Sequence, residues 1–236
     1  MYLSRLVLNP RSRAVRNDLS DCRGMHRTIL SAFPQANKDQ GGARSEFGVL
    51  FRADSDSRSG RITLLVQSEV EPDWTRLPND YLLDDFDELE NPAVKRIDGS
   101  YDTLDQGRRL RFRLRANPTR RISSNNTDEK SGGQGKRVEI YGEDKQMDWL
   151  RRKSEQHGFR LLTVRINPGV LNARAQPEGK ILGWRGKAEK PMKFGSVLFE
   201  GELEITDCAL FSDALKNGIG SGKAFGFGLL SIASSK

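Results

Sequence analysis

His26 is the residue whose chemistry the sequence defines most clearly. It lies in DCRGMHRT, residues 21–28, with Arg23 and Arg27 beside it. An imidazole can accept or donate a proton near neutral pH, and a guanidinium can hold a phosphate through charge-assisted hydrogen bonds. Cleavage of RNA by its own 2′-hydroxyl requires this set: proton transfer, in-line geometry and stabilised phosphate charge. On spacing alone, a single helical histidine is more often a surface or capping residue.

The other metal-binding and nucleophilic residues are few. The chain has two histidines and two cysteines, namely His26, His157, Cys22 and Cys208, with no CxxC pair. They form neither a disulfide framework nor a zinc site, although carboxylates alone could still hold a cation. We interpret His157 as a residue at a helix end and both cysteines as small packing residues. We therefore expect no metal and no cofactor.

Glycines are concentrated in NGIGSGKAFGFGLLSIA, residues 217–233. A Walker loop would need glycine in place of Asn217 and serine or threonine in place of Ala224, and no dinucleotide fingerprint is present. Because glycine lets a backbone approach another group closely, we expect this stretch to pack against another backbone or an anion, with Lys223 available for a phosphate. We call residues 218–228 the glycine-rich loop; its glycines are Gly218, Gly220, Gly222, Gly226 and Gly228.

The charge of the chain favours a polyanionic partner. The net charge is +7 and the pI is about 9.5, which fits nucleic acid, although solubility alone could also explain it. In the predicted strand 110–118, side chains alternate, so Arg111, Arg113 and Arg115 share one face. No acid is interleaved with them, and we expect a polyanion to relieve their repulsion. Further basic positions are Arg151, Arg152, Arg185 and Lys187.

Hydrophobic patterning predicts two copies of one α+β unit. The first has strands at 2–9, 47–52 and 61–67 and a helix at 15–33. The second has strands at 110–118, 159–166 and 196–205, helices at 143–156 and 207–216, and an irregular basic segment at 179–193. Each first strand ends similarly, in LVLNP (6–10) and LRANP (114–118). This order predicts two tandem ferredoxin-like domains with antiparallel sheets, residues 1–95 and 96–236.

The composition is that of a globular protein, with 36% hydrophobic and 30% charged residues. No apolar run approaches the roughly 20 residues of a membrane helix. The first residues place an apolar run before basic ones, the reverse of a secretory signal. We expect a cytoplasmic protein without a membrane partner.

Seven motifs occur in the same order as in a known family. They are MYLSRLVLN (1–9), MHRTILSAFP (25–34), LRFRLRANPTR (110–120), GKRVEI (135–140), WLRRK (149–153), VLFEGELEITD (197–207) and GIGSGKAFGFGLLSIA (218–233). The set spans nearly the whole chain. In these motifs the chain resembles the CasE family, the CRISPR RNA-processing endoribonucleases of type I-E systems.

The resemblance implies two tandem RRM-like (RAMP) domains and metal-independent cleavage of the repeat RNA at the 3′ base of its stem-loop. It also implies a 5′-hydroxyl product, retention of the hairpin, and assembly with other Cascade subunits. His26 matches the catalytic histidine, whereas Arg23 replaces a family tyrosine; a guanidinium cannot accept a proton but can neutralise the phosphate. A non-catalytic RNA-binding subunit is the alternative. The expected RNA-binding residues are Arg27, Arg111, Arg113, Arg115, Lys136, Arg137, Arg151, Arg152, Arg185, Lys187 and Lys223.

Overall fold

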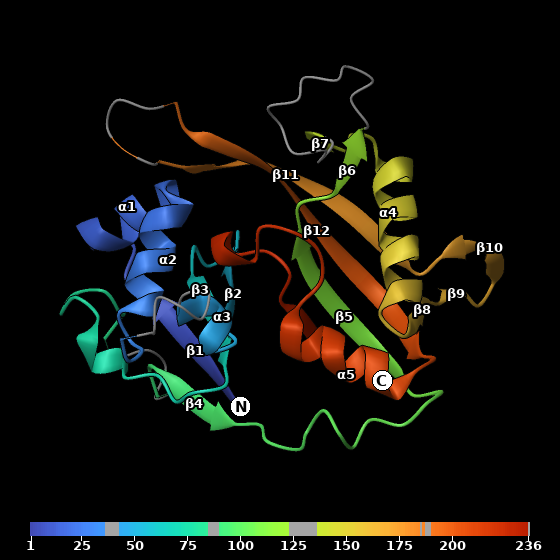
Figure 1. The fold of residues 1–236 in the computed structure, drawn as a ribbon, viewed down its shortest axis with the longest axis horizontal. Coiled ribbons are helices and arrows are strands. Elements are labelled where there is room, and N and C mark those ends of the chain that lie inside the picture. The colour runs from blue at the N-terminus through green and yellow to red at the C-terminus, as the bar shows by residue number, and fades with distance from the viewer. Residues whose placement is uncertain (36–42, 85–89, 123–135, 185, 187–189, 236) are drawn as a thin grey trace, which may run out of the picture.

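The first half of the chain builds a four-stranded antiparallel sheet (Figure 1). The computed structural model describes residues 1–35, 43–84, 90–122, 136–184, 186 and 190–235. Its N-terminal unit contains β1 (Tyr2–Leu8), α1 (Arg13–Ser20), α2 (Cys22–Leu30), α3 (Ala43–Glu46), β2 (Leu50–Ser55), β3 (Ile62–Ser68), the 3-10 turn η2 (Trp74–Arg76) and β4 (Ala93–Arg96). The strand order is β2-β3-β1-β4.

The second half repeats this arrangement. Its C-terminal unit contains β5 (Arg109–Ala116), β6 (Thr119–Ile122), β7 (Lys136–Glu139), α4 (Glu143–Gln156), β8 (Phe159–Leu161), β9 (Thr163–Val164), β10 (Asn167–Leu171), β11 (Ala173–Gly183), β12 (Met192–Ile205), α5 (Cys208–Asn217), η3 (Lys223–Phe225) and β13 (Leu230–Ser234). The main strand order is β11-β12-β5-β13, with β8 beside β12.

In each main strand order, the first of the four strands along the chain therefore lies between the third and the fourth, and every pairing is antiparallel. The two halves share one topology, and the expected tandem ferredoxin-like fold is confirmed. The expected division between residues 95 and 96 falls just before the last residue of β4; the boundary itself stays a prediction.

Alternating apolar residues explain where each core lies. Leu6 and Leu8 of β1 are fully buried, together with Val15, Ile29 and Phe51. In the C-terminal unit the predicted inward face of β5 is confirmed, because Leu110, Phe112 and Leu114 are buried against α4 and α5 residues such as Leu150 and Phe211. Each unit thus has its own hydrophobic core.

Some expected elements are wrong. The helix expected at 15–33 is two helices, because the backbone at Asp21 is extended and its carboxylate accepts a hydrogen bond from the Arg23 N–H, which starts α2. The segment expected to be irregular at 179–193 begins and ends in strand, since β11 continues to Gly183 and β12 starts at Met192. Cys208, expected to be a packing residue, is exposed at the first position of α5.

The long β11–β12 hairpin reaches from the C-terminal unit over α1 and α2 (Figure 1). It contacts the N-terminal unit where α2 begins: the backbone N–H of Trp184 donates to the Asp21 carboxylate at 3.0 Å. A Cβ added at Gly183 would lie 3.3 Å from Cγ of Arg23. The hairpin therefore holds the beginning of α2 between the two units.

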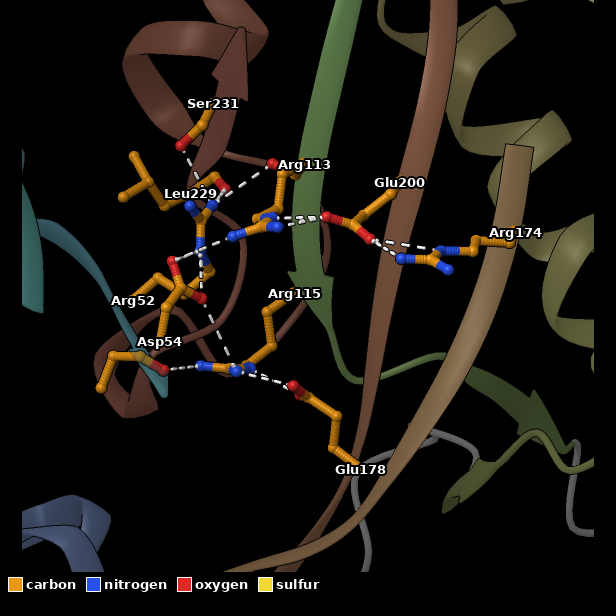
Figure 2. A network of polar contacts seen from close by, with 10 residues as sticks. Arg52, Asp54, Arg113, Arg115, Arg174, Glu178, Glu200, Leu229 and Ser231 are labelled. Carbon is orange, nitrogen blue, oxygen red and sulfur yellow. Dashed lines mark hydrogen bonds and ion pairs between the residues drawn. The ribbon is translucent and has the colours of Figure 1, made fainter. Parts of the chain in front are cut away.

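A buried arginine joins the two units (Figure 2). Arg52 of β2 is 2% exposed, and its Nε donates to Asp54 at 2.9 Å. Its Nη1 donates to Ser231 Oγ at 3.0 Å and to the backbone oxygens of Arg113 and Leu229 at 3.3 Å each. A buried guanidinium needs such partners because an unpaired charge is costly to bury.

The arginine face of β5 has acidic partners. Arg113 donates to Glu200 at 2.6 Å, and Arg115 makes a two-pronged contact with Glu178 at 2.6 and 2.7 Å (Figure 2). Neighbouring β12 places glutamates opposite the β5 arginines. The expectation that this face lacks acidic partners is therefore wrong, because the acids come from strands distant in sequence. The RNA contacts assigned to Arg111, Arg113 and Arg115 stay predictions.

Candidate active site

His26 lies where the N-terminal unit meets the glycine-rich loop. Its ring is stacked on Phe51 of β2, with centroids 6.5 Å apart and planes 19° apart. It meets Phe225 of η3 edge-on at 6.5 Å. Among the described residues, no group hydrogen-bonds the buried Nδ1 of His26. A buried nitrogen without a partner is uncommon, and a catalytic role is one of the explanations for such an atom.

The surroundings of His26 keep its imidazole neutral. Burial, followed by the positive charges of Arg44 and Arg23, lowers the pKa of His26 to about 4. At neutral pH the ring is therefore unprotonated and can accept a proton. Sequence reasoning found Arg23, which is on the same helix, but missed Arg44, which only the fold brings from α3.

The backbone of the glycine-rich loop lies close to side chains of β2 and α4. All five of its glycines have φ between 74° and 90°, a region that only glycine adopts readily. A Cβ at Gly218 would lie 2.9 Å from Leu50 Cδ1, and one at Gly226 would lie 3.2 Å from Phe51 Cε2. A Cβ at Gly220 would lie 3.3 Å from the Trp149 ring. The loop thus packs tightly on β2 and α4, and so fixes Phe225 beside His26.

A cavity of about 370 Å³ lies on the α4 side of the loop, and we call it the basic cavity. Burial lowers the pKa of Lys223, and the positive charges of Arg44 and Lys153 lower it further. Burial also lowers the pKa of His157, followed by the charges of Lys153 and Lys223. Crowded cations of this kind favour an anion in the cavity. Its basic lining residues are Arg120, Arg121, Arg137, Lys153, His157 and Lys223.

Sequence reasoning placed only part of this cavity. Arg137 and Lys223 were expected contacts and do lie together, whereas Arg120, Arg121 and Lys153 were missed and His157 was given no chemistry. The signal was available for Arg120 and Lys153, because both belong to motifs quoted above. Arg44 connects the two places, since its charge lowers the pKa of both His26 and Lys223.

The remaining expected contacts are dispersed. Arg27 on α2 and Arg151 on α4 are exposed, and Arg151 pairs with Asp148 at 3.5 Å. Arg152 lines a neighbouring cavity of about 320 Å³ that also includes Arg120. Arg185 and Lys187 lie outside the described residues, and the side chain of Lys136 is not described.

Two other features are absent from the described part of the chain. No group of three or more His, Cys, Asp or Glu side chains in the described ranges is placed to hold a metal ion. No helix in the same part of the chain is long and apolar enough to span a membrane.

Two ferredoxin-like units, with a glycine-rich loop of the second packed on β2 of the first, a neutral imidazole beside arginines and a basic cavity, define a tandem ferredoxin-like protein suited to bind anions. The chain belongs to the CRISPR associated protein family, whose model matches residues 1–234. Membership of the CasE family, expected from the motifs, is confirmed by its relatives.

Two curated relatives match this chain over nearly the whole length of both sequences. The chain is 36% identical to the CRISPR-associated endoribonuclease Cse3 of Thermus thermophilus, over 99% of this chain and 100% of the relative. It is also 36% identical to the Cascade subunit CasE of Escherichia coli, over 99% of both. A solved structure of Cse3 bound to a 19-nucleotide RNA matches with a TM-score of 0.77 at 34% identity, over 99% of this chain and 100% of that one.

Proposed function

We propose that this chain is a metal-independent endoribonuclease that cleaves CRISPR precursor RNA at the 3′ base of the repeat stem-loop. The observation that carries the proposal is the neutral imidazole of His26, held beside Arg23 and Arg44 at the junction of the two units. Support comes from the two relatives, one named an endoribonuclease and solved with RNA, the other named a Cascade subunit.

In the proposed reaction His26 takes the proton of the 2′-hydroxyl next to the cut. The 2′-oxygen bonds to phosphorus and the bond from phosphorus to the 5′-oxygen breaks, which leaves a 2′,3′-cyclic phosphate and a 5′-hydroxyl. The leaving 5′-oxygen takes a proton from His26 or from solvent. Arg23 and Arg44 offset the extra negative charge on the phosphate as it becomes pentacoordinate.

The basic cavity and the α4 arginines provide the proposed hold on the hairpin. A-form RNA is recognised mainly through its backbone and shape, which suits arginines and lysines that offer no fixed base contact. Lys153, Lys223 and Arg120 would contact phosphates, with Arg151 and Arg152 beside them on α4. Assembly with other Cascade subunits follows the relative named as a Cascade subunit, and retention of the cleaved hairpin is part of the proposal.

A labelled repeat hairpin incubated with the protein in EDTA tests the proposal. We expect cleavage by the native chain, and a loss of about 10²–10⁴-fold in the single-turnover rate for His26→Ala. His157→Ala, the matched change at the other histidine, should still cut bound RNA. Arg23→Ala should slow cleavage without abolishing it.

A 2′-deoxy nucleotide at the cut tests the chemistry separately. Its hairpin should bind and stay intact, because the attacking oxygen is gone. Cleavage of that substrate would contradict the 2′-hydroxyl mechanism. Binding of the native hairpin without cleavage would instead identify a non-catalytic RNA-binding subunit.

A further inference from the structure

A separate cavity of about 410 Å³ lies between the two units, and we call it the interdomain pocket. The N-terminal unit contributes residues of α1, α2 and β2 to it, including Met25 and Phe51. The C-terminal unit contributes β11 and the glycine-rich loop, including Ile181, Leu182 and Phe225. Pockets at domain interfaces are the commonest places for ligands.

The interdomain pocket shares two walls with His26. Phe51 and Phe225 both line the pocket, and each has its ring centroid 6.5 Å from that of the imidazole. A nucleotide whose sugar is at His26 would therefore carry its base, or the base of its neighbour, to the mouth of this pocket. The basic cavity shares no lining residue with it.

The charges in the interdomain pocket are balanced, unlike those in the basic cavity. Its lining has two acids, Asp18 and Glu178, and two bases, Arg115 and Lys180. Glu178 accepts hydrogen bonds from Arg115 at 2.6 Å and from Ser196 at 2.7 Å. A phosphate would gain little here, because its charge would meet carboxylates as well as cations.

A nucleobase fits this combination of walls. It is uncharged and flat, its faces stack on aromatic or apolar side chains, and its edge carries hydrogen-bond donors and acceptors. Enzymes that modify a base take it out of the stack into such a pocket, so pockets of this kind can accept an unpaired base. The apolar side chains of Met25, Ile181 and Phe225 and the polar Glu178 and Ser196 provide both kinds of contact.

We propose that the interdomain pocket binds one unpaired base of the RNA beside the cut, and that this contact positions the sugar and phosphate at His26. The proposal rests on the proposed function. The occupied pocket would add specificity to a site whose remaining contacts are to the backbone. Phe225 would then be a positioning residue, because it contacts both the base and the imidazole.

Abasic substitution tests the proposal with the protein as it exists. Hairpins with one abasic ribonucleotide at each position flanking the cut keep every 2′-hydroxyl and lose one base. We expect one of them to be cut about tenfold more slowly in single turnover, because stacking on an aromatic side chain is lost. Binding of the hairpin should change much less.

The variant Ile181→Trp tests the same pocket from the protein side by filling it. We expect it to cut the intact hairpin about tenfold more slowly and to show no further loss with the abasic substrate. Val170→Trp, at a 49% exposed position on β10, is the matched control and should behave like the native chain. If Ile181→Trp fails to fold in a thermal melt, Leu19→Trp replaces it, because Leu19 lines the pocket at a 42% exposed position.

The outcomes separate the two proposals. A native chain that leaves the intact hairpin uncut would contradict the proposed function. A native chain that cuts the intact and every abasic hairpin equally well would overturn the pocket alone. Equal abasic sensitivity in the native chain and in the folded pocket-filling variant would overturn it too.

Discussion

His26 combines two unusual properties: a buried ring nitrogen without a hydrogen-bond partner among the described residues, and a lowered pKa. Its Nδ1 is buried without a hydrogen-bond partner in the described structure, and an unsatisfied buried group of this kind costs about 1–3 kcal/mol. The same burial, with Arg44 and Arg23 nearby, lowers the pKa of the ring to about 4. The chain thus tolerates a local cost at the position where the proposed reaction needs a proton acceptor.

The pH dependence of cleavage should reveal this depressed pKa. A base acts only when unprotonated, so kcat/KM should stay flat as the pH falls through 6.5, the ordinary value for histidine, and drop towards 4. Arg44→Ala removes a positive charge that opposes protonation, so the drop should move to higher pH. Arg58→Ala, an exposed arginine in the turn between β2 and β3, should leave the profile unchanged. A native profile that breaks near 6.5 would contradict this account.

At the scale of elements, β2 and the glycine-rich loop together build the site. β2 carries Leu50 and Phe51, which receive the close approach of Gly218 and Gly226, and then Arg52, which bonds to the C-terminal unit. One short strand therefore contacts the imidazole through Phe51 and the second unit through the next residue. The position of the loop depends on this strand.

Two glycine substitutions separate backbone strain from this packing. Gly226 and Gly107 have φ of 85° and 82°, but an added Cβ meets Phe51 at 3.2 Å at the first and nothing within 4 Å at the second. Both alanine variants should lose about 1–2 kcal/mol of stability from the left-handed backbone. Only Gly226→Ala should also slow single-turnover cleavage, because Phe51 and Phe225 must shift around His26. Equal cleavage by the two variants would show that the loop does not position the ring.

Some elements could be predicted from the sequence and others could not. The bounds of α4 and the capping of α5 by Asp207 were predictable, because caps and apolar spacing are local signals; the Asp207 carboxylate accepts from the Leu210 N–H at 2.9 Å. The break at Asp21 was missed because the apolar spacing continues across it. The acidic partners of Arg113 and Arg115 could not be predicted, since β11 and β12 pair with β5 only in three dimensions.

In the candidate site, too, residues within short motifs could be predicted, whereas residues that only the fold brings close could not. His26, Arg23 and the glycine-rich loop are predicted from short motifs, and their roles stay predictions. Arg44 was not, because α3 follows α2 after a separate segment and nothing in its sequence marks it. The composition of the basic cavity required the fold, which brings β6, β7, α4 and the loop to one place.

At the scale of the whole molecule, the net charge is +7. The basic side chains that produce it are unevenly distributed between ion pairs and the basic cavity. Many arginines are paired internally, such as Arg113 with Glu200 and Arg160 with Glu204. The basic cavity, in contrast, gathers basic side chains; burial lowers the pKa values of its Lys223 and His157, and neighbouring positive charges lower them further. The cavity and the nearby α4 surface are therefore where a polyanion gains most.

Binding of the repeat hairpin should weaken steeply with added salt, and Arg151→Ala should flatten that dependence. Removing one phosphate contact lowers the slope of log K against log salt by about one. Arg151→Ala should weaken binding more than it slows cleavage of bound RNA. The matched control is Arg160→Ala, because Arg160 is 62% exposed and ion-paired, as Arg151 is at 55%. Equal binding by the Arg151 variant in a filter assay at moderate salt would contradict the prediction.

The order of the chain sets when the site can form. Leu50 and Phe51 belong to the half that a ribosome makes first, whereas the glycines that cover them, Gly218 and Gly226, are made much later. During synthesis these two apolar side chains therefore stay exposed until the second half of the chain is made. Chaperones commonly shield such surface.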